Sequence, residues 1–116
     1  MSFALTTDQV RNRTKTVTRR LRWMFAKVGD VVQPVVKAQG LKKGENVEKI
    51  GGPIRFVGVR RERLNVLLED SLTSSREVVA EGFPHLTKGE FMQMFCDHNG
   101  CDDDAFVTRI EFEYLG

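Results

Sequence analysis

The densest group of reactive side chains lies at residues 14–20, where the sequence reads Thr-Lys-Thr-Val-Thr-Arg-Arg. A hydroxyl becomes a useful nucleophile only when a neighbouring base removes its proton. Lys15 can supply that base if its pKa is lowered. Burial would lower this pKa, and so would repulsion from the guanidiniums of Arg13, Arg19 and Arg20. The segment therefore offers an amine base close to several hydroxyls.

The spacing of Lys15 and Thr18 decides whether these two residues can act together. In a regular strand their side chains would point to opposite faces, whereas a turn or a bulge near Lys15 would bring them together. Residues 14–20 also fit a simpler interpretation, a basic strand on a solvated or phosphate-facing surface. The residues by themselves leave both interpretations open.

Acyl transfer and amide hydrolysis also need an acid/base group, and Glu81 is the candidate. A helix that ends at Gly82 would place Glu81 at the negative end of the helix dipole, which disfavours the ionised carboxylate and raises its pKa. A raised pKa would suit proton transfer. The simpler alternative is a surface glutamate without a role.

Residues 96–104, Cys-Asp-His-Asn-Gly-Cys-Asp-Asp-Asp, suggest metal binding. Cys96, His98 and Cys101 are three possible ligands, but a structural zinc site generally has four and the sequence has no second cysteine pair. The aspartate run does not follow the spacing of a calcium-binding loop. We therefore expect no metal and no cofactor, and a turn that leads into a solvated acidic loop.

The composition is that of an ordinary soluble globular domain. The chain has 116 residues, 41% of them hydrophobic and 29% charged, which predicts one domain over residues 1–116 with one modest core. No apolar run is long enough to span a membrane, the first ten residues do not resemble a signal peptide, and two cysteines make no disulfide framework. We expect an intracellular, cytoplasmic protein without a membrane partner.

Charge is distributed unevenly along the chain. Residues 1–63 hold 15 Lys and Arg against 5 Asp and Glu, whereas residues 64–116 hold 3 against 11. The basic half carries a dense arginine group: Arg11, Arg13, Arg19, Arg20 and Arg22. Guanidiniums suit phosphates and Trp23 can stack on a base, which predicts a nucleotide or RNA partner. The alternatives are that the two halves neutralise each other across the fold and that Trp23 belongs to the core.

Alternating apolar residues and turn signals predict the strands. These are expected over 14–20, 31–36, 54–59 and 106–114, with a short first strand at 2–5. Residues 38–53 are polar and rich in glycine, and they are expected to form a loop or an extended hairpin.

Capping signals and apolar periodicity predict the helices. One is expected over 7–13 behind a capping box at Thr6, one over 60–68 with its three leucines inward, one that ends before Gly82, and one from a capping box at Thr87 to residue 97. Together the elements predict a small α+β domain, built on either a partly closed barrel or an open sheet.

Several of these segments resemble the ASCH domain family, whose members are small proteins of the PUA-like β-barrel superfamily. The resemblance is carried by Lys-Thr-x-Thr-x-Arg at residues 15–20, Gly-Asp-Val at 29–31, Glu-Gly-Phe at 81–83 and Arg-Ile-Glu-Phe-Glu-Tyr at 109–114. It covers most of the chain and is weakest over 38–53. The overall pattern is similar to short stand-alone members, some of them phage-encoded.

The resemblance implies a small PUA-like mixed β-barrel flanked by short helices, with a cleft for a nucleoside, a nucleotide or RNA. Similar single-domain bacterial members include amidohydrolases that remove the acetyl group from N4-acetylcytidine. By motif position, the resemblance implies Lys15 as the base, Thr18 as the nucleophile and Glu81 as the acid/base or orienting group. Arg20 matches the motif's arginine and would contact the substrate or an oxyanion. Arg19 differs from the family, because those enzymes carry an apolar residue there.

We therefore expect an amidohydrolase of the N4-acetylcytidine type that acts as a monomer and needs no cofactor. Its catalytic residues would be Lys15, Thr18 and Glu81. Five further residues are expected to contact the substrate or RNA: Arg13, Arg19, Arg20, Arg22 and Trp23. The alternative is a non-catalytic RNA- or nucleotide-binding module, and a third possibility is a metal-assisted ribonuclease.

Overall fold

Four strands and four short helical segments make up the part of the chain that the structure describes. A computed structural model describes residues 1–37, 46–69 and 71–116; residues 38–45, within the segment expected to be a loop, and residue 70 lie outside the described part. The elements in chain order are α1 (Thr7–Arg11), β1 (Val17–Arg20), β2 (Val31–Val32), β3 (Ile54–Arg63), the 3-10 helix η1 (Leu64–Leu68), α2 (Ser71–Ala80), α3 (Lys88–Asn99) and β4 (Phe106–Tyr114).

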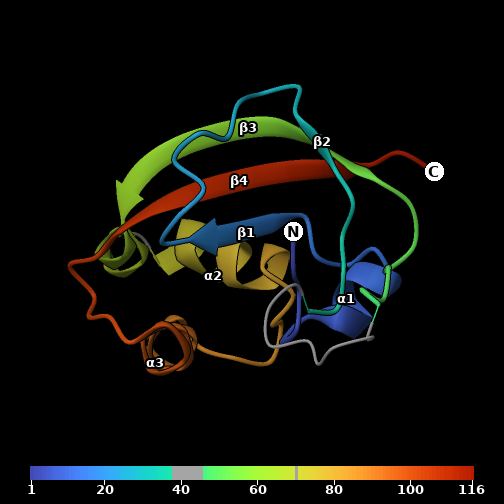
Figure 1. Ribbon diagram of the computed structural model, residues 1–116. Coiled ribbons are helices and arrows are strands. Elements are labelled where there is room, and N and C mark those ends of the chain that lie inside the picture. Colours follow the sequence, from blue (N-terminus) through green and yellow to red (C-terminus); the bar gives the residue numbers. More distant parts are fainter. Residues whose placement is uncertain (38–45, 70) are drawn as a thin grey trace.

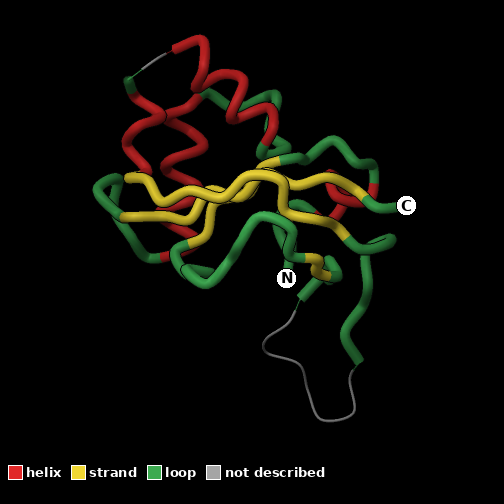
Figure 2. The backbone as a smooth tube through the Cα atoms, turned by 90° about the horizontal axis from the view of Figure 1, so that it is seen from above, coloured by secondary structure: helices red, strands yellow, loops and turns green. Residues whose placement is uncertain are grey.

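The strands form one antiparallel sheet in the order β1-β4-β3-β2. The pairing of β3 with β4 changes register between Phe56 and Gly58, and such a bulge bends a strand and increases its twist. Figure 1 shows β3 and β4 curving together over β1, with α2 and α3 near one end of the sheet and α1 near the other. Figure 2, seen from above, shows most of the helical turns gathered near one end of the strands. The expected small α+β fold is confirmed, with a curled, half-barrel sheet at its centre.

The strand predictions are confirmed where side chains alternate, and one helix prediction is wrong. The strand expected over 106–114 has those bounds, but the strand expected over 54–59 continues to Arg63. A helix was expected from Arg60, but residues 60–63 remain in strand β3. The whole length of β4, as far as Phe106, lies beside β3 and offers these residues a pairing partner. Only Leu64–Leu68 turn helically, and Leu68 is exposed rather than inward.

The two predicted capping boxes have different outcomes. At α3 the box is confirmed, because Thr87 Oγ1 accepts from the backbone N–H of Glu90 while the Glu90 carboxylate accepts from that of Thr87. At α1 the box is wrong, because the Thr6 side chain forms no capping bond and is buried instead. The helix nevertheless forms close to its predicted position.

The amino-terminal segment and β2 are less regular than the sequence predicts. Ser2 forms only an isolated bridge to Val35, so residues 2–5 are not a strand. The strand expected over 31–36 is reduced to Val31–Val32, after which Val35 makes isolated bridges. Pro34 has no N–H to donate, which prevents continuous pairing here.

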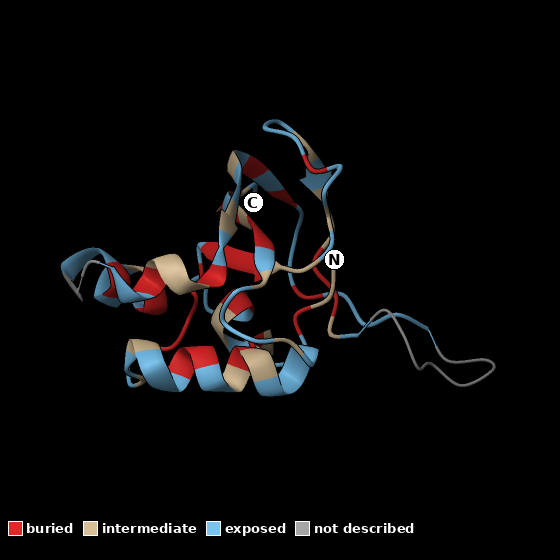
Figure 3. Ribbon diagram, turned by 90° about the vertical axis from the view of Figure 1, so that its left-hand side faces the viewer, coloured by how far each residue is buried: buried red, intermediate tan, exposed pale blue. Residues whose placement is uncertain are grey.

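The core contains two clusters of buried apolar residues, and β4 contributes to both. The first cluster comprises Phe3, Val10, Ala26, Ile50, Ile54, Phe56, Ile110 and Phe112. The second comprises Leu64, Leu67, Val78, Phe83, Phe91, Met92, Phe95 and Val107. Figure 3 shows the buried residues where strands and helices face each other. No helix in the described residues is long and apolar enough to cross a membrane.

Candidate functional site

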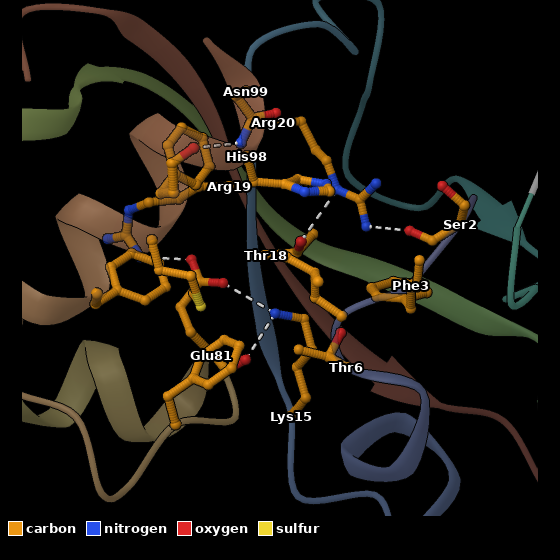
Figure 4. A pocket seen from close by; sticks show the side chains of 16 residues that line it. Ser2, Phe3, Thr6, Lys15, Thr18, Arg19, Arg20, Glu81, His98 and Asn99 are labelled. Atoms are coloured by element: carbon orange, nitrogen blue, oxygen red, sulfur yellow. Dashed lines mark hydrogen bonds and ion pairs between the residues drawn. The ribbon is translucent and has the colours of Figure 1, made fainter. Parts of the chain in front are cut away.

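A pocket of about 130 Å³ lies between the two core clusters (Figure 4). Its apolar lining includes Phe3, Leu5, Phe83, Phe91, Met94 and Phe95. Its charged lining is Lys15, Arg19, Arg20 and Glu81, and Ser2, Thr6, Thr18, His98 and Asn99 complete the polar part. Apolar walls with a few convergent polar groups are typical of sites for small ligands.

Lys15 and Glu81 form a buried ion pair in this pocket. Lys15 Nζ lies 2.9 Å from Glu81 Oε1 and donates a second hydrogen bond of 2.7 Å to the Glu81 carbonyl oxygen. The two side chains are only 3% and 4% exposed. Burial lowers the pKa of Lys15 below its ordinary 10.5, although the Glu81 carboxylate acts in the opposite direction. Burial thus favours the neutral amine that a base requires.

A turn before β1 places Lys15 in the pocket. Arg13 has a φ of 63°, and the backbone N–H of Lys15 donates to the Gln9 carbonyl oxygen at 3.3 Å. Lys15 therefore precedes the regular strand, and its side chain lines the same pocket as Thr18. This is the turn that the spacing of the two residues required.

The end of α2 places Glu81 opposite. The helix ends at Ala80, whose carbonyl oxygen accepts from Thr16 N–H at 2.8 Å and so joins α2 to the start of β1. Gly82 follows with a φ of +102°, and a Cβ there would lie 3.0 Å from Gln9 Cγ. The absence of a side chain at Gly82 allows this close approach, which brings Glu81 to Lys15.

Arg19 joins Glu81 to a network of ion pairs. Its Nη1 lies 2.9 Å from Glu81 Oε2, its Nη2 lies 2.5 Å from Glu77 Oε1, and its Nε donates to Glu62 Oε1 at 3.2 Å. Arg109 binds Glu77 from the other side through Nε and Nη2, at 2.6 and 2.9 Å. The basic and acidic halves of the chain thus neutralise each other here. The three carboxylates of Glu62, Glu77 and Glu81 thus surround the Arg19 guanidinium.

Arg20 lies beside Thr18. Its Nε donates to Thr18 Oγ1 at 3.1 Å, its Nη2 donates to the Ser2 carbonyl oxygen at 2.6 Å, and its Cζ lies 4.8 Å from the centre of the Phe3 ring. Burial lowers the pKa of Arg20 to about 10, despite the favourable effect of Glu81. The contacts of the described residues include none between Lys15 Nζ and Thr18 Oγ1.

Three residues expected to bind substrate or RNA lie outside the pocket lining. Arg13 is exposed, with its guanidinium 5.6 Å from the Tyr114 ring, and Arg22 is exposed on the loop after β1. Trp23 is partly buried against the first core cluster, 6.2 Å from the Phe56 ring centre. The exposed aromatic ring of this loop is Phe25, which the sequence did not single out; it is 69% exposed.

His98 and Asn99 are pocket residues that sequence reasoning missed. Phe91, Met94, Phe95 and His98 follow the i, i+3, i+4, i+7 pattern of one helix face, and all four line the pocket. Figure 4 shows the His98 side chain entering the pocket from α3, on the side of Arg20 and Thr18. Extending the apolar face of the helix by one turn would have found His98.

Of the possible metal ligands in residues 96–104, His98 lines the pocket, whereas the cysteines and the aspartates are not among the lining residues. Among the described residues, Asp102, Asp103 and Asp104 form a group with ligand atoms within 4.8 Å of one another, and all three are exposed. Cys96 and Cys101 are free thiols with Sγ atoms 3.7 Å apart. Burial, aided by the Cys101 contact, raises the pKa of Cys96 to about 11, which disfavours the thiolate that binds metals.

Comparison with known proteins identifies no relative of this chain. No family model, no curated protein and no solved structure matches the chain. The case for a function therefore rests on the geometry of the pocket and on the resemblance of its motifs.

Proposed function

We propose that this chain is a PUA-like domain of the ASCH type that hydrolyses the N-acyl group of a modified nucleoside, of which N4-acetylcytidine is the reference substrate. The observation that carries the proposal is the buried Lys15–Glu81 pair in a pocket that Thr18 also lines. An amine of lowered pKa near a hydroxyl and a carboxylate suits nucleophilic cleavage of an amide. The curled sheet with helices near both ends is compatible with the barrel that the resemblance implies.

In the first half-reaction, Thr18 Oγ1 attacks the acyl carbonyl carbon while neutral Lys15 takes the hydroxyl proton, directly or through one water. The carbonyl electrons move onto oxygen, and the Arg20 guanidinium stabilises that oxyanion. When the carbonyl re-forms, the carbon–nitrogen bond breaks and the proton on Lys15 passes to the leaving nitrogen. Cytidine departs as the free amine, and the acyl group remains on Thr18 as an ester.

In the second half-reaction, water attacks the ester carbonyl and gives one proton to Lys15. The bond from the carbonyl carbon to Thr18 Oγ1 breaks, and Lys15 returns its proton to that oxygen. The acid product leaves as a carboxylate after it loses its own proton to solvent. Glu81 orients the amine throughout, because one of its oxygens faces Lys15 and the other faces Arg19.

The test is chromatographic detection of cytidine after N4-acetylcytidine is mixed with the purified protein. Lys15→Ala and Thr18→Ala are expected to lower turnover at least about 100-fold, in the range of general-base effects. Thr16→Ala is the matched control, because Thr16 is exposed in the same segment. Turnover should rise with pH along a limb whose midpoint lies below 10.5, since the pKa of Lys15 is lowered by burial. Retained turnover in both catalytic variants, or no cytidine with the unchanged protein, contradicts the proposal.

A non-catalytic RNA-binding module is the second candidate, and the exposed loop after β1 favours it. Met24 and Phe25 are 71% and 69% exposed, and the charged side chains of Arg22 and Lys27 are exposed beside them. Aromatic rings on a basic surface stack on unpaired bases. Affinity for single-stranded RNA should then fall steeply with salt, and Phe25→Ala should weaken it about tenfold whereas Val28→Ala should not. Binding that is absent or insensitive to salt removes this candidate.

A further inference from the structure

Arg20 carries a positive charge that the surrounding ion pairs leave unbalanced. In the buried network the cations Lys15, Arg19 and Arg109 face the anions Glu62, Glu77 and Glu81. The network's exposed ends, Arg60 and Glu111, add one charge of each sign. Arg20 forms no ion pair with any carboxylate of the described residues. Arg20 is therefore a pocket cation that no carboxylate of the described residues pairs with.

The Arg20 guanidinium also keeps donors free for a ligand. Its Nε binds Thr18 and its Nη2 binds the Ser2 carbonyl oxygen, whereas Nη1 has no partner among the described residues. Every fully buried side-chain nitrogen and oxygen of those residues has a partner, so Nη1 keeps some exposed surface, and Arg20 is one of the residues that line the pocket. The guanidinium carbon lies 4.8 Å from the centre of the Phe3 ring, a cation–π contact that uses no N–H donor. A guanidinium edge with free N–H groups fits a planar oxyanion.

We propose that Arg20 forms a subsite for a small carboxylate beside Thr18, which binds the acid released from the acyl group. The ligand is expected to be a small carboxylate, because apolar side chains such as Leu5 and Phe83 line the walls of the pocket. These walls suit a methyl or short alkyl group next to the carboxylate, so acetate fits better than phosphate. The identification of this acid as a reaction product rests on the proposed amidohydrolase function; the subsite itself rests on the Arg20 charge, which has no ion-pair partner among the described residues, and on the free Nη1.

Retention of the acid at Arg20 has a kinetic consequence. The carboxylate occupies the place where the oxyanion forms during turnover, so acetate competes with the acyl group of the substrate. Acetate is therefore an inhibitor that competes with N4-acetylcytidine. Removal of the Arg20 charge weakens this inhibition.

The subsite is tested by titrating sodium acetate into the full chain and following the Arg20 Nε–H signal by NMR, with sodium phosphate as the second arm and chloride holding ionic strength constant. We expect one saturable acetate site, with weaker phosphate binding. Arg20→Gln is expected to weaken acetate at least about tenfold, because a charged hydrogen-bond donor is lost. Arg22→Gln is the matched control, since Arg22 is an exposed arginine outside the pocket, and it should bind acetate as the unchanged protein does.

A second variant guards against loss of structure, because Arg20 also holds the Ser2 carbonyl oxygen. Thr18→Ala keeps the guanidinium and should still bind acetate, although it should lose turnover. The subsite is overturned if acetate gives no saturable shift, if phosphate binds more tightly, or if Arg22→Gln weakens acetate as much as Arg20→Gln. Acetate binding without hydrolysis of N4-acetylcytidine keeps the subsite and removes the amidohydrolase, whereas hydrolysis without acetate binding does the reverse.

Discussion

Removal of the Glu77 charge should destabilise the protein in a manner that depends on pH. Glu77 receives hydrogen bonds from Arg109 and Arg19, at 2.6 and 2.5 Å for the nearest atoms. Burial by itself would raise the pKa of Glu77, but these two guanidiniums outweigh it and lower the pKa from 4.5 to about 2. The perturbation is Glu77→Gln, which preserves the shape of the side chain and removes its charge.

The size and the sign of the effect follow from this shift. A pKa change from 4.5 to about 2 corresponds to about 3 kcal/mol of folding stability. Solvent reaches the side chain, which is 13% exposed, so we reduce the expected loss to about 2 kcal/mol. Between pH 4.5 and pH 2 the unfolded chain binds the proton and the folded chain does not. The stabilisation is therefore complete above the unfolded pKa and is lost as the pH falls toward 2.

The assay is urea unfolding of the unchanged protein and Glu77→Gln at pH 7, 5, 3.5 and 2.5. We expect their difference in free energy of unfolding to be largest at pH 7 and to shrink below pH 4.5. Glu113→Gln is the control, because Glu113 is 44% exposed and its pair with Arg55 lies on the surface, where such pairs contribute about 1 kcal/mol or less. A Glu77→Gln loss that is unchanged at pH 2.5, or no larger than that of the control, refutes the reasoning.

Two further changes test how the site and its supporting helix are built. Gly82→Ala should cost about 2 kcal/mol in thermal unfolding, because its φ is +102° and a Cβ would press on Gln9. Gly89→Ala, inside α3, should instead be neutral or stabilising, because a Cβ there would meet only Thr87 Oγ1, at an ordinary contact distance of 4.0 Å. Equal effects of the two changes would contradict this reasoning. Thr87→Ala should cost about 1 kcal/mol through loss of the α3 cap, and Thr87→Ser should restore it; an unchanged midpoint with Ala would contradict the cap's role.

Local patterns were sufficient for the elements whose side chains alternate or whose ends are capped. Strand β4 was predicted with its observed bounds, and the start of α3 was predicted from the capping box of Thr87 and Glu90. The end of β3 was missed, because residues 60–63 form helix or strand according to whether a partner strand continues beside them. Thr6 was assigned as a cap, yet its side chain is buried in the pocket wall, an environment that the local sequence does not contain.

In the candidate site, too, some features were predictable from the sequence and others depend on tertiary contacts. Lys15, Thr18 and Glu81 could be nominated from residue types and from a motif resemblance, and the structure brings all three to one pocket. The part played by Arg19 could not be predicted, because it depends on carboxylates from β3 and from the end of α2. His98 was missed although its position on the α3 face was readable from the sequence.

The sequence by itself determined the α+β class, most strand positions, the cap of α3 and the asymmetry of charge, because each depends on neighbours within a few residues. Only the tertiary structure decided which charges meet. It joins Lys15 and Arg19 to Glu81 across more than 60 residues of chain, and it gives Arg20 no ion pair with a carboxylate of the described residues. It also buries Trp23 partly and exposes Phe25. Ion pairing and burial depend on distances through space, which the order of residues along the chain does not specify.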